Sequence, residues 1–410
     1  MPKPMLSAEQ AISQMLAAVE PLTHRVTVPI SAALGRVLAQ PLSADINVPG
    51  YDNAAMDGYA LRASDVKPGK PLTVAGIVLA GHAFTEQVPP GSCVRVTTGA
   101  EMPAGLDTVV MQEQVELSQT ELQQQILCQL QPTVGEHVRR AGEDIVKGAQ
   151  VFTGGHQLRP ADIGLLASIG IANVKVLRQL KVAVFSSGDE LVPPGQSLPE
   201  GHIYDSNRYV IAAMLSRLGV EVIDLGLLPD DPKAIEQAFK QAMAQADVLI
   251  TSAGVSVGDA DYTRQILHKL GQINFWQVAI KPGKPFAFGK LDNCWFFGLP
   301  GNPVAAVVTL EQLVQPVLRK LSGENVVGEV KLLSAECEVP LKKQPGRMDF
   351  QRGWYWQGVE GLQVKPAGSQ SSGVLSSIAN ANCYIVLPAD SASLPAGETV
   401  SILPFSCLLR

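Results

Sequence analysis

Three turns rich in glycine and proline, each following an apolar run, carry the residue types of an anion site. They span Thr251–Tyr262, Lys281–Phe286 and Gly298–Pro303. Turns of this kind point backbone N–H groups toward an anionic ligand. The first turn adds carboxylates, the second adds two lysines, and the third adds the start of a helix. Together they predict a phosphate-bearing ligand that is held with a divalent metal ion.

Aspartates near these turns are the candidate metal ligands. Asp231 is explained locally as the N-cap of a helix, whereas Asp230 and Asp261 have no such local role. Two carboxylates about 4 Å apart repel by roughly 4 kcal/mol at an effective dielectric of 20, so a phosphate nearby requires a cation. Oxygen ligands beside phosphate favour Mg²⁺ over zinc.

Other charged clusters are weaker signals. Lys281 and Lys284 flank a Pro-Gly turn, and their adjacent prolines restrict the lysines toward a shared anionic target. Asp57 lies in a turn-rich stretch without a local explanation. The run Arg139–Asp144 has the composition of a solvated surface segment, which is the more common case.

Strands and helices are expected to alternate from residue 181 to about residue 321. This alternation predicts a mostly parallel sheet covered by helices on both faces. Ligands of such sheets bind beyond the carboxyl ends of the strands. Because the turns at 186–190, 251–262 and 298–303 all follow predicted strands, we expect them to converge on one edge.

The chain of 410 residues is too long for one ordinary core, and we interpret it as multidomain α/β plus β. A capping box at Ser7 and Gln10 predicts a helix over Ala8–Val19. A helical N-terminal region carries an inserted β-rich domain and is followed by a mostly parallel α/β domain and a C-terminal β-barrel-like domain. The predicted boundaries are 1–47 with 145–179, 48–144, 180–325 and 326–410.

Composition excludes several classes of protein. The hydrophobic content is 46%, the charged content is 17% and the net charge is −6, which disfavours a general nucleic-acid binder. No run of about 18 apolar residues predicts a membrane span, and no signal peptide is recognised, so we expect a cytoplasmic protein. The six scattered cysteines and six histidines lack the spacing of a disulfide framework or a zinc site. Rossmann and P-loop glycine motifs are also absent.

Taken together, these segments resemble the molybdopterin molybdenumtransferase family, which includes bacterial MoeA and the E domain of gephyrin. The resemblance covers essentially the whole chain in the family's order. The matching stretches beside the three turns are 49–60, 97–100, 109–113, 140–144, 187–191, 203–207, 346–350 and 371–373.

This resemblance implies the last step of molybdenum cofactor synthesis. Molybdate is inserted at the dithiolene of adenylylated molybdopterin, and the adenylate is cleaved as AMP in a Mg²⁺-dependent reaction. A homodimer is implied, with each active site between the α/β domain of one subunit and the inserted domain of the other. Transient contacts with the molybdopterin adenylyltransferase and with proteins that receive the cofactor are expected, but none with nucleic acid or membrane.

The resemblance also assigns site residues. The catalytic acids of the family fall on Asp57, Asp144, Glu190, Asp230 and Asp261, and the metal would be held by Glu190, Asp230 and Asp261. The expected substrate-binding residues are Thr98, Ser252, Gly254, Ser256, Gly258, Lys281, Lys284, Pro300, Gly301, Asn302, Pro303, Arg347 and Ser371. One departure is Gln277, where the bacterial pattern often has a basic residue, so we leave Gln277 out of the site.

Three other functions compete with this interpretation. A molybdopterin adenylyltransferase has a similar α/β domain, but it would leave the inserted domain and the C-terminal region without a task. A non-catalytic scaffold, a second role of the gephyrin E domain, would not need the five acidic positions. The third possibility is a binding protein for a phosphate-bearing ligand, which is all that the residues predict without the resemblance.

Overall fold

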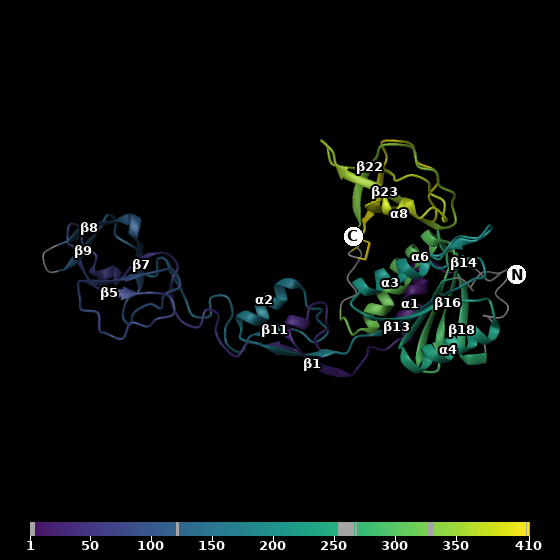
Figure 1. Cartoon of the computed structure of the whole chain (residues 1–410). Coiled ribbons are helices and arrows are strands. Elements are labelled where there is room, and N and C mark those ends of the chain that lie inside the picture. Colours follow the sequence, from purple (N-terminus) through teal and green to yellow (C-terminus); the bar gives the residue numbers. More distant parts are fainter. Residues whose placement is uncertain are drawn as a thin grey trace.

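The computed structural model describes residues 5–119, 123–252, 266, 269–325, 332–406 and 408–409. Figure 1 shows an elongated chain. The inserted domain lies at one end, a small lobe lies in the middle, and the α/β and C-terminal domains lie together at the other end. Within the described residues, no helix is long and apolar enough to cross a lipid bilayer.

The α/β domain is built on a six-stranded sheet in the order β16-β13-β17-β21-β20-β18. The first four strands are parallel, as the alternation predicted, and β20 runs antiparallel to both of its neighbours. The strands are β13 (Lys181–Ser187), β16 (Glu221–Leu228), β17 (Val248–Ser252), β18 (Gln272–Gln277), β20 (Pro285–Leu291) and β21 (Cys294–Leu299).

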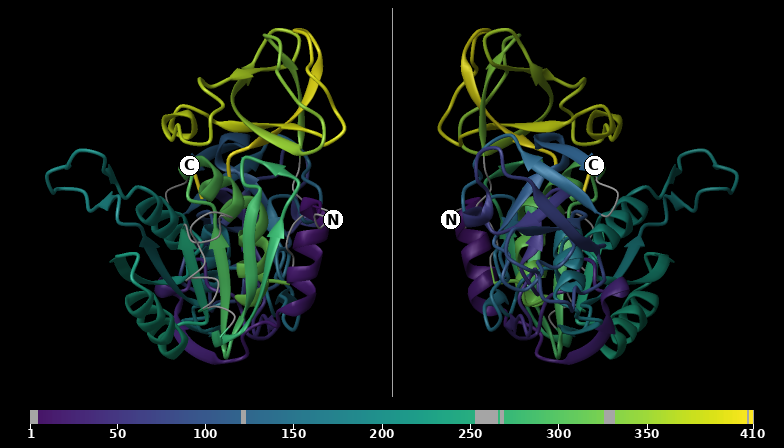
Figure 2. Two further views of the ribbon diagram at one scale, coloured as in Figure 1. Left: turned by 90° about the vertical axis from the view of Figure 1, so that its right-hand side faces the viewer. Right: turned by 90° about the vertical axis from the view of Figure 1, so that its left-hand side faces the viewer.

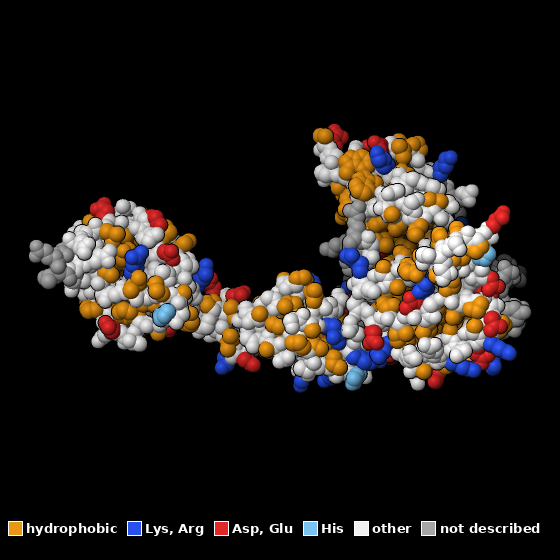
Figure 3. All heavy atoms as spheres, viewed as in Figure 1, with side chains coloured by type: hydrophobic (Ala, Val, Ile, Leu, Met, Phe, Trp, Pro, Cys, Tyr) orange, Lys and Arg blue, Asp and Glu red, His pale blue; other side chains and the backbone are white. Residues whose placement is uncertain are grey.

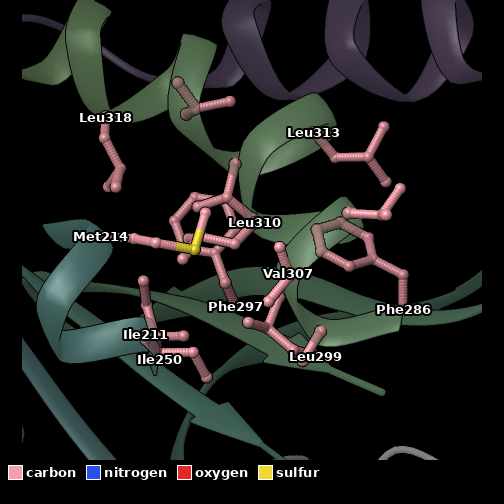
Figure 4. Close-up of a cluster of buried hydrophobic side chains, with 14 of the residues drawn as sticks. Ile211, Met214, Ile250, Phe286, Phe297, Leu299, Val307, Leu310, Leu313 and Leu318 are labelled. Carbon is pink, nitrogen blue, oxygen red and sulfur yellow. The ribbon is translucent and has the colours of Figure 1, made fainter. Parts of the chain in front are cut away.

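Helices cover both faces of this sheet. Successive residues of β13 alternate between two apolar clusters, with Val182 and Val184 in one and Ala183 and Phe185 in the other. Figure 4 shows the larger cluster, in which Phe297 packs below the helical segment that follows β21. The helices are α3 (Asn207–Arg217), α4 (Pro232–Gln245), α6 (Pro303–Thr309) and α7 (Gln315–Leu321), with the π-helical turn η4 (Leu310–Val314) between the last two.

The first helix, α1 (Ala8–Ala18), begins at the predicted capping box, in which the Gln10 N–H donates to Ser7 Oγ at 3.1 Å. Its packing differs from the prediction. Met15 is buried in the larger core of the α/β domain, and Lys320 Nζ donates to the carbonyl oxygen of Leu16 at 2.8 Å. Helix α1 therefore packs with the α/β domain and not in a separate helical N-terminal domain.

The middle lobe is also less helical than predicted. Its main element is the antiparallel pair of β1 (Arg25–Pro29) and β12 (Asn173–Leu177), and β2 (Leu42–Ser43) pairs with β11 (Gln150–Phe152). The short 3-10 turn η1 (Ile30–Ala32) and the helix α2 (Pro160–Ser168) complete it. The prediction of a helical region was wrong here because Arg25–Pro29 alternates between exposed and half-buried residues, which is the period of a strand.

The inserted region contains a six-stranded sheet in the order β7-β4-β6-β5-β9-β8. Figure 3 shows that a narrow neck joins this region to the rest of the molecule. The strands of this sheet are β4 (Gly58–Leu61), β5 (Leu72–Val78), β6 (Ser92–Val96), β7 (Thr108–Met111), β8 (Val115–Gln119) and β9 (Gln124–Cys128). The region also contains the separate pair β3 (Asn53–Ala54) and β10 (Val138–Arg139), and the 3-10 turns η2 (Ala63–Asp65) and η3 (Gln112–Gln114).

The C-terminal region is a closed five-stranded barrel, which confirms the predicted barrel. It closes because β23 pairs with both β24 and β25. A short strand of the α/β domain, β19 (Ile280–Lys281), joins it alongside β23. The barrel lies beyond one end of the large sheet (Figure 2). Its elements are β22 (Leu333–Cys337), β23 (Met348–Gln357), β24 (Leu362–Pro366), α8 (Ser376–Ala379), β25 (Cys383–Leu387) and β26 (Thr399–Pro404).

One buried and one partly buried polar contact hold these parts together. Glu311 in η4 accepts from the Tyr384 hydroxyl at 2.9 Å and from Ser406 Oγ at 2.6 Å, and burial raises the pKa of the Glu311 carboxyl. Arg178, which follows β12, forms a two-pronged ion pair with Asp247 at 2.7 and 2.6 Å. Burial alone would raise the pKa of Asp247, but hydrogen bonds from Arg178 and from the Lys181 N–H lower it below the ordinary value.

Gly283 lies between the two candidate lysines and has no room for a side chain. Its φ is +119°, and a Cβ atom there would lie 2.5 Å from Thr309 Oγ1 on α6. We expect Gly283→Ala to destabilise the α/β domain by about 1–3 kcal/mol, because both the backbone conformation and the contact become strained. Denaturant unfolding followed by tryptophan fluorescence measures this, since Trp276 and Trp295 lie in the same sheet.

The matched control is Gly164→Ala in α2, where a Cβ atom would meet nothing within 4 Å. This change should be neutral or stabilising by up to about 1 kcal/mol. A Gly283→Ala protein as stable as the wild type would contradict the close approach of the lysine turn to α6.

Candidate functional site

The carboxyl ends of three parallel strands form the centre of the candidate site. Register pairs Ser186 of β13 with Ser252 of β17, and Ser252 with Leu299 of β21. The predicted turns that follow β13 and β21 therefore lie at one edge, as expected. Ser252 itself is buried there. The rest of the middle turn, with the predicted residues Gly254, Ser256, Gly258 and Asp261, lies outside the described residues.

The second predicted turn, which carries Lys281 and Lys284, reaches the same edge beside the antiparallel strand β20. Ala287 of β20 pairs with Gly298 of β21, so the start of β20 lies beside the end of β21. Gln277 at the end of β18 pairs with Pro285 at the start of β20. Lys284 directly precedes β20 and is exposed at this edge.

Three exposed carboxylates gather at the β13–β16 end of the edge. Ser187 pairs with Leu228, which brings the residues that follow the two strands close together. The N–H of Asp230 donates to Asp189 Oδ1 at 3.1 Å. Glu190 folds back over Gly188, where a Cβ atom would lie only 2.6 Å from Glu190 Oε2. Sequence reasoning missed Asp189, although it directly precedes a predicted acid.

These oxygen donors are of the type that Mg²⁺ prefers. Glu190 and Asp230, two of the three predicted ligands, lie at the same strand ends, and the third, Asp261, is outside the described residues. Across the part of the chain that the structure describes, no group of three or more His, Cys, Asp or Glu side chains is arranged to hold a metal ion. The donor chemistry thus fits Mg²⁺, and the described part of the set is incomplete.

The turn after β21 leads directly into α6. The pair Asn302-Pro303 has the residue types of a helix cap followed by proline. Pro303 does occupy the first turn of this helix, but Asn302 makes no side-chain capping hydrogen bond. The Val304 N–H donates instead to the carbonyl oxygen of Ser372 at 3.0 Å, which brings the exposed Ser371 of the barrel next to the turn that contains Pro300 and Gly301.

Cations gather where the α/β domain meets the barrel. Lys281 on β19 pairs in register with Asp349 on β23, and its Nζ lies 3.1 Å from the Asp349 carboxylate. Asp349 is buried, whereas Lys281 is 42% exposed. Arg347 directly precedes β23 and is half-buried. The fold thus brings the predicted residues Lys281 and Arg347 together.

Lys343 adds a buried cation that sequence reasoning missed. Its Nζ donates to the carbonyl oxygen of Gln344 at 2.9 Å. Burial lowers the pKa of Lys343, against the opposing attraction of Asp349. Nothing in the sequence around Lys343 distinguishes it from a solvated lysine, so only the fold identifies it.

The inserted region holds a second group of predicted residues. Asp57 Oδ1 accepts from the Thr98 N–H at 2.6 Å and from Thr98 Oγ1 at 2.8 Å. The Thr98 backbone N–H, followed by the Thr98 hydroxyl, lowers the pKa of Asp57 below its ordinary value of 3.8. Asp57 is therefore an ionised, exposed acceptor at neutral pH, suited to anchor a hydrogen-bond donor.

Two matching stretches of this region lie side by side. Arg140 NH1 pairs with the Asp52 carboxylate at 2.6 Å, and the Ala141 N–H donates to the same carboxylate at 2.8 Å. The run 139–144 is thus partly an ion-pair segment and not simply solvated. Asp144 is exposed where the chain leaves the inserted region, and its N–H donates to the carbonyl oxygen of Val48 at 3.0 Å.

One chain does not bring the two groups together. Figure 1 places the inserted region, with β5, β7, β8 and β9, at the opposite end of the molecule from the α/β domain. Asp57 directly precedes β4 of the inserted region, whereas Glu190 and Asp230 follow strands of the α/β sheet. The lobe with β1 and β12 separates the inserted region from the α/β domain. A single copy of the chain therefore keeps the described residues of the two groups apart.

We expect Thr98→Val to raise the pKa of Asp57 only part of the way to its ordinary value. The substitution removes the hydroxyl donor, but the backbone N–H, which is the larger influence, remains. NMR titration of the carboxyl carbons measures this, with Asp57→Asn to assign the resonance. An unchanged pKa would show that the hydroxyl contact does not form.

Three regions of the chain match models of known protein families. Residues 6–170 match the family model of the MoeA N-terminal region (domain I and II), residues 183–320 match a probable molybdopterin binding domain, and residues 334–405 match the MoeA C-terminal region (domain IV). The chain is also similar to a solved molybdopterin biosynthesis MoeA protein from Pyrococcus horikosii. The TM-score is 0.78 and the identity 31%, with 98% of this chain and 99% of that chain covered.

Relatives with assigned activities are similar over nearly their full length. The molybdopterin molybdenumtransferase of Haemophilus influenzae is 49% identical over 406 residues, which are 99% of this chain and 100% of that protein. The corresponding protein of a Nostoc species is 38% identical, with 91% of this chain and 87% of that protein covered. The chain therefore belongs to the MoeA family of molybdopterin molybdenumtransferases, which are transferases of molybdenum cofactor biosynthesis.

Proposed function

We propose that this protein inserts molybdate into adenylylated molybdopterin and releases AMP in a Mg²⁺-dependent reaction. The observation that carries the proposal is the shared edge of the large sheet. Carboxylates lie at its β13–β16 end, and Lys284 lies at its β20 end, close to Lys281 on the neighbouring strand β19. A ligand with a phosphoanhydride at one side and an oxyanion at the other matches this division of charge.

The acidic end would hold the phosphoanhydride. Glu190 and Asp230, with Asp261, would bind Mg²⁺, and the bound ion would neutralise and polarise the phosphates. Ser252 and the backbone of the turns after β17 and β21 would hold the pterin and its phosphate. These roles need no residue from another domain.

The basic end would hold molybdate. Lys281, Lys284 and Arg347 supply charge that opposes that of the dianion, and Ser371 lies beside the start of α6. Because Asp349 accepts from Lys281, the ammonium group is oriented before the anion arrives. An oriented cation costs less entropy on binding than a free side chain.

A second copy of the chain would supply Asp57 and Thr98. Since the lobe keeps the inserted region far from the sheet edge in one chain, the proposed homodimer is the simplest way to complete the site. In the dimer, Asp57 would position the attacking oxygen. A cytoplasmic location and transient contacts with the molybdopterin adenylyltransferase and cofactor-receiving proteins are part of the same proposal.

The direct test is incubation with adenylylated molybdopterin and Mg²⁺, with and without molybdate. We expect AMP release that depends on both ions, measured by chromatography of the nucleotide product. AMP release independent of molybdate would count against the proposed reaction. Adenylylation of metal-free molybdopterin by ATP would instead identify the protein as an adenylyltransferase.

Asp57→Asn should abolish molybdate-dependent AMP release while leaving the binding of adenylylated molybdopterin intact. The substitution removes the ionised acceptor, and Asp57 lies far from the proposed ligand turns of its own chain. Release rates and a binding titration measure the two effects. Retained turnover would show that Asp57 has no catalytic role.

Mixing two inactive variants tests the shared site. Asp57→Asn and Asp230→Asn affect opposite halves, so a mixed dimer has one doubly altered site and one intact site. After subunit exchange at equal concentrations, we expect about a quarter of wild-type AMP release, because half of the dimers are mixed. No recovery after demonstrated exchange would place both residues in a site within one chain.

A further inference from the structure

We propose that Asn207, at the start of α3, is a positioning residue that fixes the Ser252 hydroxyl as a hydrogen-bond donor to the ligand. It also holds the end of β17 against the turn after β21. The inference deepens the proposed function and rests on it, since the ligand in question is the adenylylated pterin. No site residue predicted from the sequence has this role.

The geometry rests on one side-chain amide that bridges two candidate ligand segments. Asn207 Nδ2 donates to Ser252 Oγ at 2.6 Å and to the carbonyl oxygen of Gly301 at 2.7 Å. A carbonyl oxygen can only accept, so the amide nitrogen must face Gly301. This contact fixes the orientation of the Asn207 amide.

The orientation determines what the Ser252 hydroxyl can do. A hydroxyl carries one hydrogen and two lone pairs. Because Ser252 Oγ accepts from Asn207, its own hydrogen is directed elsewhere. Ser252 ends β17 at the carboxyl edge, beside the turns that would hold the phosphate and pterin. Asn207 thereby makes Ser252 a donor, which is the role that an anionic or carbonyl oxygen of the ligand requires.

The start of α3 is anchored firmly enough to impose this geometry. The Asp205 carboxylate accepts from the Arg208 N–H at 3.2 Å and from Arg208 Nε at 2.9 Å. It also accepts from Ser186 Oγ at the end of β13, at 3.1 Å. Asp205 and Arg208 are both buried. The segment 205–208 therefore joins the ends of β13, β17 and β21.

A second observation separates this role from simple stabilisation. Asn207 Oδ1 is buried and has no hydrogen-bond partner in the part of the chain that is described. Leaving a buried acceptor unpaired is costly, and such groups are rare in folded proteins. Stability alone does not favour an asparagine here, but orienting Ser252 and Gly301 together requires its two donors.

The test measures the dissociation constant of adenylylated molybdopterin by fluorescence titration. Asn207→Ala frees the Ser252 hydroxyl to rotate, and we expect binding about tenfold weaker than in the wild type. Asn207→Asp keeps the side-chain size but presents only acceptors. The Ser252 hydroxyl would then donate to the new carboxylate and not to the ligand, so the loss should be larger. Exposed Asn274→Ala on the edge strand β18 is the matched control and should bind as the wild type does.

A double substitution distinguishes positioning from a general structural effect. If Asn207 acts through Ser252, the double variant Asn207→Ala/Ser252→Ala should bind the ligand less than about twofold more weakly than Ser252→Ala does. Independent losses that multiply would overturn the inference, as would wild-type affinity in Asn207→Ala. Thermal unfolding accompanies each titration, and Asn207→Asp decides the outcome if Asn207→Ala does not fold. Wild-type protein that fails to bind adenylylated molybdopterin would instead refute the proposed function.

Discussion

The parallel, in-register pairing of β13, β17 and β21 is the constraint on which the rest of the structure depends. It places Ser186, Ser252 and Leu299 in one row, so three turns far apart in the sequence begin at the same edge. Apolar side chains on both faces of these strands hold the pairing in place, since a one-residue slip would exchange the two cores. The positions of the candidate site residues that follow these three strands depend on this register.

The order of the strands also separates charge along the edge. The carboxylates of Glu190 and Asp230 follow β13 and β16, whereas Lys281 and Lys284 precede β20 on the other side of β21. Opposite charges at the two ends would attract each other weakly through solvent, and the intervening strands β17 and β21 separate them. The buried Asp349 partly neutralises Lys281 and orients its ammonium group.

The sequence predicted features that depend on neighbouring residues, such as the start of a helix, but not contacts between distant segments. The capping box at Ser7 and Gln10 fixes where α1 begins, but it contains no information about the core on which Met15 packs. Likewise, asparagine at position 302 is a residue type that often caps a helix. In this structure, however, the Val304 N–H donates to the carbonyl oxygen of Ser372 and not to the Asn302 side chain. The roles of Asn207, Lys343 and Asp349 depend on contacts between distant segments. A single sequence without the strand register does not reveal them.

The lobe between the two halves of the site is joined to the α/β domain by a partly buried ion pair. Arg178 donates two hydrogen bonds to the Asp247 carboxylate there. The depressed pKa of Asp247 means that this stabilisation is complete above a pH of about 3.8 and is lost as the pH falls below that value. At neutral pH this ion pair is therefore intact. The proposed homodimer would complete both sites from two chains while each lobe keeps the geometry seen in one chain.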